Sequence, residues 1–230
     1  MEALAERRAT RPAPAGRPFV TMAYAQSLDG SIAAADGRPL ALSSDDSLLL
    51  THRLRAAHDG LLVGIGTILA DNPRLTARLV DGPQPQPVIV DTHLRTPPAA
   101  LVLHHPRRPW LAAAEPFPLE AQTALQAAGA EMIAVTRAAD GRLDLADLLH
   151  RLAVRSLSSL LVEGGSRILH SFLQANLVDW VIVTVAPRFV GGRPALIGAS
   201  NGGLPDVRLA RWAPSGPDLV VWGEPTWPSP

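Results

Sequence analysis

The amino-acid sequence predicts a single α/β domain, in which a mostly parallel sheet is covered by helices on both faces and ends in antiparallel strands at its C-terminal edge. Strand-like and helix-like segments alternate along most of the 230 residues, which is typical of parallel strands joined by helical crossovers. The last strand-like segments have no helix between them, which favours antiparallel pairing. No internal repeat divides the chain, and its length suits one unit with a sizeable core.

Each element of the N-terminal half has its own sequence signal. A mainly apolar run, Phe19–Ser27, predicts the first strand and stops at the turn-forming pair Asp29-Gly30. Ser44-Asp45-Asp46 has the composition of a helix N-cap and first turn, so a helix is expected over Leu48–Leu54. Apolar runs bounded by Gly or Pro predict two buried strands, with a short helix after the first: strands 60–64 and 87–91, helix 67–70.

The C-terminal half continues the alternation up to residue 175. Apolar residues at positions 145, 148, 149 and 152 have the spacing of an amphipathic helix, which is predicted over Asp144–Arg155. Apolar and periodic runs predict the remaining elements: strands 109–113, 131–135, 159–162, 180–187, 207–212 and 219–222, and helices 119–128 and 166–175.

The two ends of the chain are predicted to lie outside the domain, which is expected over residues 19–223. Residues 1–18 carry several Pro and Arg and are expected to be a flexible arm, while residues 224–230 are expected to be a tail. The N-terminus lacks the apolar stretch of a signal peptide, and no run of 18 apolar residues occurs. We therefore expect a cytoplasmic protein that does not enter a membrane.

The composition excludes several classes of chemistry. The charges balance, with 21 basic and 21 acidic residues and no long run of either sign, which argues against nucleic acid as a partner. All the basic residues are Arg, so no lysine Schiff base or lysine proton donor is available, and the absence of Cys excludes thiolate chemistry. The seven His show no metal-binding spacing and no Gly-x-Ser-x-Gly motif is present, so neither a metal site nor a serine hydrolase is expected.

Two glycine-rich turns each join a predicted strand to a predicted helix: Gly64-Ile65-Gly66-Thr67 and Glu163-Gly164-Gly165-Ser166. Glycine lets backbone N–H groups approach a phosphate, and the N-terminus of the following helix favours negative charge. Ligands of open parallel sheets bind at the carboxyl ends of the strands, where both turns are expected. For either turn taken alone, tight backbone geometry is favoured over a binding role, and neither turn is a P-loop or a full Gly-x-Gly-x-x-Gly.

Charged residues follow the first turn. The functional interpretation is that Asp71 and Arg78 face the ligand cleft, where Arg55 and Arg78 bind a phosphate through bidentate contacts. The alternative is a surface connection at Asp-Asn-Pro, with arginines that are solvated or paired with carboxylates.

Taken together, these segments resemble the pyrimidine reductase of riboflavin biosynthesis. That reductase is the C-terminal domain of a fused deaminase–reductase in many bacteria and stands alone in archaea and fungi. The resemblance covers about residues 18–222, in several ordered motifs. The motifs are Gln26–Gly30, His52–Ala56, Val63–Thr76, Val90–Pro97, Leu161–Gly165, Phe172–Asp179 and Ala186–Gly192.

The resemblance implies a dihydrofolate-reductase-like, three-layer α/β/α fold and, usually, a homodimer. It also implies hydride transfer from NADPH to C1′ of a ribosylamino-pyrimidine 5′-phosphate, which gives the ribitylamino product. The enzyme's task is then alignment, electrostatics and exclusion of water. No deaminase zinc motif precedes the domain, since the sequence has no His-x-Glu and no Cys, so a separate deaminase is expected.

Site residues are carried over position by position. The cofactor-binding candidates, including the glycines of the two turns, are Ala25, Gly64, Gly66, Thr67, Asp71, Thr92, Gly164, Gly165, Ser166 and Arg167. The substrate-binding candidates are Arg55, Leu75, Arg78 and Glu163. Glu163 is the first candidate for a catalytic proton donor, provided that its pKa is raised, and Asp71 is the second. A contact to the cofactor's 2′-phosphate is expected from Thr92, His93 or Arg95.

The sequence departs from the fused bacterial pattern at three positions. Ala23 replaces a Lys of the first strand, and Pro39 and Ala41 replace a Ser and a Trp after the first loop. Pro39 removes both a hydroxyl and a backbone donor, for which Ser43 or Ser44 is a candidate replacement.

Three functions are therefore compared. The first is reduction of the riboflavin precursor. The second is an NADPH-dependent reductase of the same fold with a different pyrimidine, pterin-like or small carbonyl substrate. The third is a non-catalytic nucleotide-binding or scaffold protein, against which the intact Glu163-Gly164-Gly165 turn and Asp71 argue.

Overall fold

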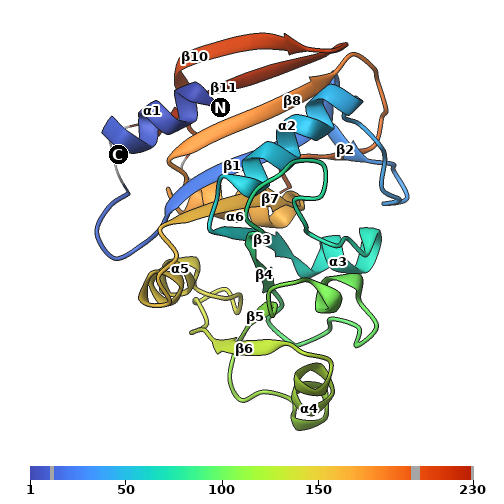
Figure 1. Cartoon of the computed structure of the whole chain (residues 1–230), viewed down its shortest axis with the longest axis vertical. Helices are drawn as coiled ribbons and strands as arrows, with labels where there is room; N and C mark the ends of the chain where they lie inside the picture. The colour runs from blue at the N-terminus through green and yellow to red at the C-terminus, as the bar shows by residue number, and fades with distance from the viewer. Residues whose placement is uncertain (11–12, 198–202, 229–230) are drawn as a thin grey trace.

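The architecture centres on a nine-stranded sheet with the strand order β10-β11-β8-β1-β7-β3-β4-β5-β6 (Figure 1). It is seen in a computed structural model that describes residues 1–10, 13–197 and 203–228. The strands of this sheet are β1 (Phe19–Ser27), β3 (Gly60–Gly64), β4 (Gln86–Val90), β5 (Trp110–Ala113), β6 (Glu131–Ala134), β7 (Ser159–Gly164), β8 (Trp180–Ala186), β10 (Asp206–Ser215) and β11 (Asp218–Thr226). A separate two-stranded sheet pairs β2 (Ser31–Ala33) with β9 (Arg193–Pro194).

The direction of the strands confirms the predicted sheet. All seven strands from β8 to β6 run parallel, while β11 is antiparallel to β8 and β10 is antiparallel to β11. Parallel strands need long crossover connections, and helices supply most of them here. These connections follow, in chain order, the strands β1, β3, β4, β5, β6 and β7. The final antiparallel strands, β10 and β11, need only a short turn, because the two neighbours run in opposite directions.

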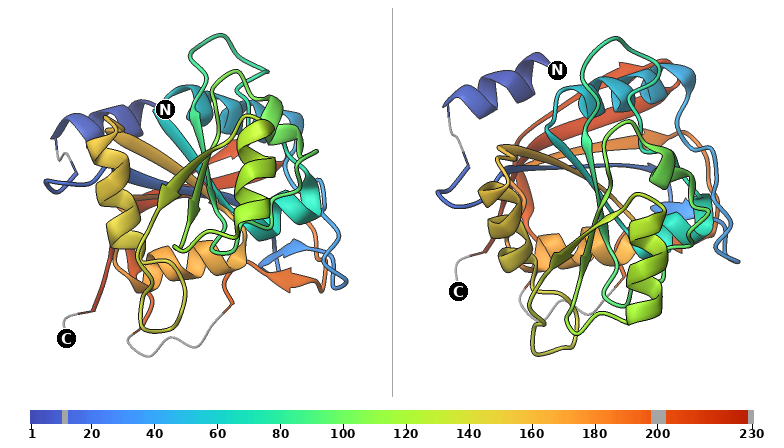
Figure 2. Two further views of the ribbon diagram at one scale, coloured as in Figure 1. Left: turned by 90° about the horizontal axis from the view of Figure 1, so that it is seen from below. Right: turned by 60° about the horizontal axis from the view of Figure 1, so that its bottom comes forward.

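Helices cover both faces of the sheet (Figure 2). They are α1 (Glu2–Thr10), α2 (Asp45–Ala56), α3 (Ile65–Asp71), α4 (Leu119–Ala127), α5 (Leu145–Val154) and α6 (Ser166–Gln174), with a 3-10 helix over Leu101–His104. Side chains alternate along each strand, so Leu61 and Val63 of β3 pack on one face and Leu62 on the other. The first face is shared with α1 to α4 and the second with α5 and α6. The predicted three-layer α/β/α arrangement is confirmed.

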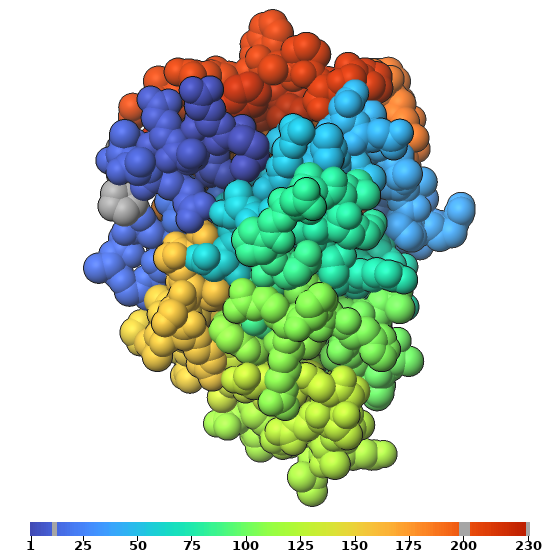
Figure 3. Space-filling view, in the orientation of Figure 1, coloured from blue at the N-terminus to red at the C-terminus, as the bar shows by residue number. Residues whose placement is uncertain are grey.

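The expectation of a flexible N-terminal arm is wrong for residues 2–10, which form α1. Leu4 is buried, with 3% of its surface exposed, and packs in the same cluster as Phe19. The Arg7 guanidinium lies 5.7 Å from the centroid of the Phe19 ring and forms an ion pair with Glu224. Figure 3 shows this N-terminal segment in blue against the red C-terminal strands. A short helix with so few apolar residues has little intrinsic stability and depends on these tertiary contacts.

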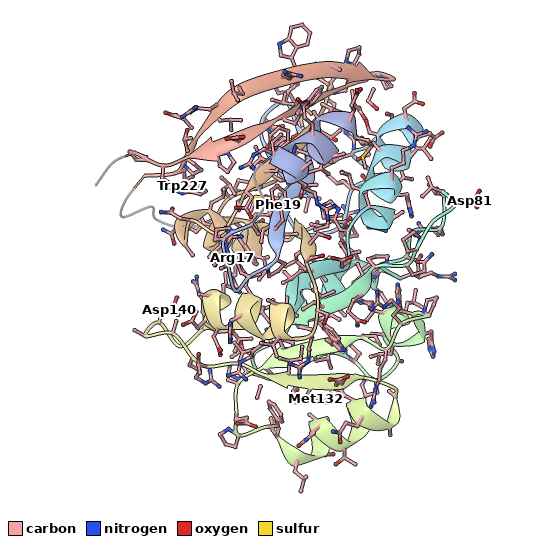
Figure 4. All side chains as sticks on the ribbon, turned by 60° about the vertical axis from the view of Figure 1, so that its left-hand side comes forward. Arg17, Phe19, Asp81, Met132, Asp140 and Trp227 are labelled. Carbon is pink, nitrogen blue, oxygen red and sulfur yellow. The ribbon has the colours of Figure 1, made fainter. Side chains whose placement is uncertain are left out.

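The C-terminal boundary also differs from the prediction, because β11 continues to Thr226 and includes part of the expected tail. Beyond it, the indole Nε1–H of Trp227 donates a hydrogen bond to the carbonyl oxygen of Leu173, 2.9 Å away on α6. Figure 4 shows Trp227 on the same side of the molecule as Arg17 and Phe19, and Asp81 on the other. Both ends of the described chain are thus attached to the sheet. None of its helices has the length and apolar character needed to cross a membrane.

The burial of His58 makes stability depend on pH. His58 is 3% exposed, and its ring nitrogens lie 2.7 Å from the Leu54 carbonyl oxygen and 2.8 Å from the Thr21 hydroxyl. Burial lowers the pKa of His58 from its ordinary 6.5 to about 4. The unfolded chain therefore takes up a proton before the folded protein does. The stability that neutral His58 contributes is fully present above pH 6.5 and is lost as the pH falls toward 4.

We expect this titration to cost about 3 kcal/mol of unfolding free energy between pH 6.5 and 4. Urea unfolding at a series of pH values measures it. His58→Gln should show a shallower decline over that range, whereas His93→Gln, a change at an exposed histidine, should leave the slope unchanged. Equal slopes for the His58→Gln variant and the unmodified protein would contradict the assignment.

Candidate active site

The two glycine turns lie next to each other at the carboxyl edge of the sheet. Strands β3 and β7 are adjacent and parallel, and Val63 is in register with Gly164. A side-chain carbon added at Gly165 would lie 3.4 Å from the Thr67 hydroxyl, so the second turn touches the helix that follows the first. The sequence placed each turn at a strand end, and the strand order makes them one structural unit.

Glycine is required in this unit for two different reasons. Gly164 has a φ of +116°, a conformation that residues with side chains rarely adopt, and its peptide bond to Gly165 is cis. At Gly64, an added carbon would lie 2.7 Å from Cγ1 of Ile168, so the glycine allows α6 to pack against the end of β3. Gly64 and Gly165 are also the N-cap residues of α3 and α6, and neither supplies a side-chain cap. The first backbone N–H groups of both helices are therefore available to an anion.

The other cofactor candidates lie at the same edge of the sheet. Ala25 is near the end of β1, which neighbours β7, and Thr92 follows β4, which neighbours β3. Ser166 begins α6 and donates a hydrogen bond from its hydroxyl to the Pro194 carbonyl oxygen, 2.9 Å away. The exposed Arg167 follows it. The sheet thus gathers the ends of four neighbouring strands, β1, β7, β3 and β4, around the two turns.

A cavity of about 320 Å³ lies between α2 and the segment after α3. Figure 3 shows the two segments, in cyan and teal, packed together on one face of the molecule. Three of its lining residues are the substrate candidates Arg55, Leu75 and Arg78. The other lining residues are Leu48, His52, Asn72, Pro73 and Arg74, so none of the described residues that line the cavity carries a carboxylate.

An ion pair joins this cavity to the glycine turns. Arg55 Nε and Nη2 each donate to one carboxylate oxygen of Glu163, both at 2.7 Å, and Arg55 Nη1 donates to the Thr76 carbonyl oxygen at 3.1 Å. The two side chains are 13% and 14% exposed. Burial alone would lower the pKa of Arg55, but the Glu163 carboxylate more than offsets it and the pKa is raised. Glu163 is thus an acceptor in two charge-assisted hydrogen bonds, and three of the five N–H donors of Arg55 are in use.

Asp71 ends α3 and differs from Glu163 in having no strong partner among the described residues. Helix α3 begins at the first glycine turn and ends at Asn72, which lines the cavity, so it spans about 10 Å between the two. Partial burial raises the pKa of the Asp71 carboxyl. A carboxyl with a raised pKa carries its proton over a wider pH range, which suits a proton donor.

Five residues of the cavity wall were not among the sequence candidates, and two of them, Arg74 and His52, carry ionisable side chains. Arg74 belongs to the quoted motif but gave no signal beyond a charged turn. His52 is fully buried, and its Nδ1 accepts a hydrogen bond from the Arg78 backbone N–H at 3.0 Å. Burial, and then the positive charge of Arg55, lower the pKa of His52 to about 4, so the ring is neutral near pH 7. In the sequence, only its position in the His52–Ala56 motif could have indicated that His52 belongs to the site.

The expected compensation for Pro39 is not supported for Ser44. Ser44 caps α2, and both its backbone N–H and its hydroxyl donate to Asp218 at 2.8 Å. The cavity between α2 and the segment after α3, called the arginine cavity below, is not lined by Ser43 or Ser44. Pro39 and Ala41 do not line it either. Across the described ranges, no group of three His, Asp or Glu side chains is arranged to hold a metal ion.

Asp29 organises the loop next to the site, in keeping with a structural role for the turn after the first strand. Its carboxylate accepts hydrogen bonds from the hydroxyls of Ser27 and Ser31 and from the backbone N–H groups of Val190 and Gly191. These donors, led by Ser27, hold the pKa of Asp29 well below its usual range. The turn that follows β1 is thereby attached to the segment before β9.

The chain is similar to known proteins over most of its length. The family model of the RibD C-terminal domain matches residues 18–221. A 2,5-diamino-6-ribosylamino-4(3H)-pyrimidinone 5′-phosphate reductase of Methanothermobacter thermautotrophicus is 38% identical over 214 residues, which are 89% of this chain and 97% of that protein.

Solved structures show the same fold. RibD of Acinetobacter baumannii superimposes with a TM-score of 0.79 at 25% identity, over 92% of this chain and 59% of that one. The riboflavin biosynthesis reductase Rib7 of Saccharomyces cerevisiae gives a TM-score of 0.78 at 23% identity, over 97% and 99% of the two chains. Dihydrofolate reductase of Enterococcus faecalis gives 0.50 at 12% identity, over 90% and 96%. The predicted dihydrofolate-reductase-like fold is confirmed.

Proposed function

The chain belongs to the RibD C-terminal domain family, and from this premise we propose that it reduces a ribosylamino-pyrimidine 5′-phosphate to the ribitylamino product, with NADPH as the reductant. One observation carries the proposal. The Arg55–Glu163 ion pair connects a phosphate-compatible pair of glycine turns with a cavity lined by three arginines. A phosphorylated cofactor and a phosphorylated substrate then bind on either side of Glu163.

The residues of the turns fit a dinucleotide. The N-termini of α3 and α6 have no side-chain cap, so their backbone N–H groups suit the cofactor's phosphates. Gly165 and Thr67 lie close together between them, and we call this part of the site the cofactor cradle. Arg95 follows β4, has 55% of its side chain exposed, and lies 3.8 Å from Asp91. It suits a 2′-phosphate, which is the basis for choosing NADPH over NADH. When bound, NADPH supplies the hydride for the reaction.

The protein's own residues orient the sugar and deliver the proton. Reduction requires the ribosyl ring to open, so that C1′ becomes an imine-like carbon. Glu163, held by Arg55, offers carboxylate oxygens to the sugar hydroxyls from a fixed position. We assign the proton to Asp71, because burial raises the pKa of its carboxyl, and not to Glu163, because Glu163 accepts two hydrogen bonds from Arg55. The Asp71 carboxyl protonates the nitrogen bound to C1′ as that carbon is reduced.

The direct test is the oxidation of NADPH, followed by absorbance, with purified protein and the ribosylaminopyrimidine phosphate. The 2-amino and the deaminated pyrimidine are assayed side by side. We expect the ribitylamino product from at least one of them. No oxidation with either substrate would refute the proposal. Turnover with NADH equal to that with NADPH would refute the cofactor preference.

A second candidate function keeps the fold and cofactor and changes the substrate to another pyrimidine, a pterin-like compound or a small carbonyl. Ala23, Pro39 and Ala41 favour it, since they replace residues of the fused bacterial pattern. A competition assay separates the two functions: NADPH binding without affinity for the ribosyl substrate supports the second. We also infer a homodimer in the cytoplasm, and light scattering of the purified protein tests the dimer.

Gly165→Ala tests the cofactor cradle. The backbone of Gly165 has a negative φ that alanine adopts easily, so the variant should fold normally. Its methyl group would lie 3.4 Å from Thr67 Oγ1 and occupy the space assigned to a phosphate. We expect NADPH affinity to fall about tenfold, measured by quenching of tryptophan fluorescence. An unchanged dissociation constant, with an unchanged melting temperature, would remove this turn from the cofactor site.

A further inference from the structure

Helix α2 forms one wall of the arginine cavity and also carries the residue that anchors Glu163. Leu48, His52 and Arg55 follow one another at helical spacing on the same face of α2, and all three line the cavity. Arg55 forms its ion pair with Glu163 from the last turn of the helix. The position of α2 therefore decides where this wall of the cavity stands.

The N-terminal end of α2 is held by the turn between β10 and β11. The backbone N–H and the hydroxyl of Ser44, which caps the helix, both donate to the same carboxylate oxygen of Asp218, each at 2.8 Å. Asp218 is buried, with 4% of its surface exposed. The Ser44 hydroxyl also lies 3.3 Å from the Ser215 carbonyl oxygen, and the hydroxyl of the buried Ser47 lies 3.5 Å from it. The first turn of α2 is thus attached to a hairpin near the other end of the chain.

Gly216 in this turn allows the hairpin to approach the helix closely. Its φ is +58°, and a carbon added to it would lie 2.5 Å from a carboxylate oxygen of Asp46, in the first turn of α2. A residue with a side chain would therefore strain the turn and push it away from the helix. Glycine lets the turn place Asp218 against the helix N-terminus, where the helix dipole also favours a negative charge.

The C-terminal end of α2 has a separate anchor in His58. The ring of His58 lies 2.7 Å from a carbonyl oxygen of the last turn and 2.8 Å from the hydroxyl of Thr21 on β1. Arg55 belongs to that end of the helix, whereas Leu48 belongs to the end that Asp218 holds. Loss of the Asp218 contacts should therefore loosen the cavity wall around Leu48 and leave Arg55 in place.

We propose that Asp218 is a positioning residue for the reduction: through Ser44 it fixes the N-terminal half of α2, and with it the part of the cavity wall formed by that half. The inference rests on the proposed function for the identity of the substrate. A loosened wall binds a ligand less well, since both contact and alignment depend on distance. The groups that act on the sugar, Asp71 and Glu163, lie on α3 and β7 and stay in place. Asp218 therefore affects the affinity for substrate more than the rate at which bound substrate reacts.

Asp218→Ala tests this role by separating affinity from rate. We expect KM for the ribosylaminopyrimidine phosphate, and its dissociation constant in calorimetry, to rise about tenfold. In the same variant kcat should change less than about threefold, and NADPH affinity should stay unchanged. Asp218→Asn keeps an acceptor oxygen for Ser44 and should restore KM to within about twofold. Ser44→Ala removes one of the two hydrogen bonds to Asp218 and should raise KM about threefold, which provides a milder variant if Asp218→Ala prevents folding.

Asp144→Ala is the matched control, because Asp144 caps α5, which packs on the other face of the sheet and outside the cavity wall. Loss of either carboxylate from its helix N-terminus should lower the melting temperature by at least about 2–4 °C. Asp144→Ala should nevertheless leave KM unchanged. Amide hydrogen exchange over residues 45–52, which needs no substrate, should accelerate in Asp218→Ala and not in Asp144→Ala.

The inference is overturned if KM is unchanged in Asp218→Ala, or if it rises equally in the two alanine variants. A fall in kcat as large as the rise in KM would also overturn it, and so would unchanged hydrogen exchange over residues 45–52. If exchange follows the expected pattern but the unmodified protein does not reduce the ribosyl substrate, the positioning of α2 by Asp218 stands and the proposed function fails.

Discussion

Replacing Asp71 with Asn is expected to lower kcat by about 10²- to 10⁴-fold, the usual contribution of a positioned proton donor. Asparagine has the same shape but cannot transfer a proton, so the change removes chemistry and leaves packing alone. Asp71 lies at the end of α3, where its side chain reaches solvent, and the folded state should be little affected. Single-turnover measurements with saturating NADPH report the chemical step directly.

The pH dependence identifies the group that acts. Partial burial raises the pKa of Asp71, so the protonated, active form persists to higher pH than for an ordinary aspartate and declines once the pH passes the raised pKa. This decline should disappear in Asp71→Asn. Asp81→Asn, an exposed aspartate outside the arginine cavity, serves as the control and should keep both the rate and the pH profile. Full activity of Asp71→Asn would return the role of proton donor to Glu163.

The second large effect is expected from Glu163→Gln, which should reduce both stability and activity. The amide keeps the volume of the carboxylate but offers one acceptor oxygen, and its NH₂ group faces the donors of Arg55. A largely buried guanidinium is left without its counter-charge, and both side chains are only about one-eighth exposed. We expect a loss of about 2–3 kcal/mol in unfolding free energy, below the range for a fully buried pair because some solvent remains.

Activity of Glu163→Gln should fall by about 100-fold or more, because the sugar loses its fixed acceptor. Urea unfolding and steady-state kinetics on the same preparation measure the two losses. Asp36→Asn is the matched control: it breaks the Arg38–Asp36 ion pair, whose side chains are 78% and 55% exposed, and should leave the unfolding free energy nearly unchanged. Equal stability losses in the two variants would show that the buried pair contributes no more than a surface pair.

Most of the sheet could be predicted because its strands and helices have local signals. The apolar runs are short, and each is bounded by turn residues, so their limits are visible without any partner. Helix α1 and the β2–β9 pair escaped prediction for the opposite reason. Leu4 is the only fully buried residue of α1, and its burial depends on Phe19, while Arg7 depends on Glu224 at the far end of the chain. Strands of three and two residues carry no period that a pattern can detect.

In the candidate site, too, the features with a local sequence signal could be predicted and the long-range contacts could not. The two glycine turns were predictable, since parallel strands bring their carboxyl ends to one edge and Gly64, Gly66, Gly164 and Gly165 mark that edge. The different roles of the arginines Arg55 and Arg78 could not be predicted from the sequence. Arg55 and Arg78 look alike in the sequence. Only the fold shows that Glu163, 108 residues from Arg55, pairs with Arg55, while no ion pair forms to Arg78 among the described residues.

The sequence by itself determined the class of fold, the order of its elements and the edge of the sheet at which ligands bind. Those features follow from local periodicity and from turn chemistry, which act over a few residues. The tertiary structure decided which charges are paired, that His52 supports Arg78, and that Asp71 is the carboxyl with the raised pKa. Pairing and burial depend on residues far apart in the chain, and the free energy of a charge is set by the neighbours that folding places around it.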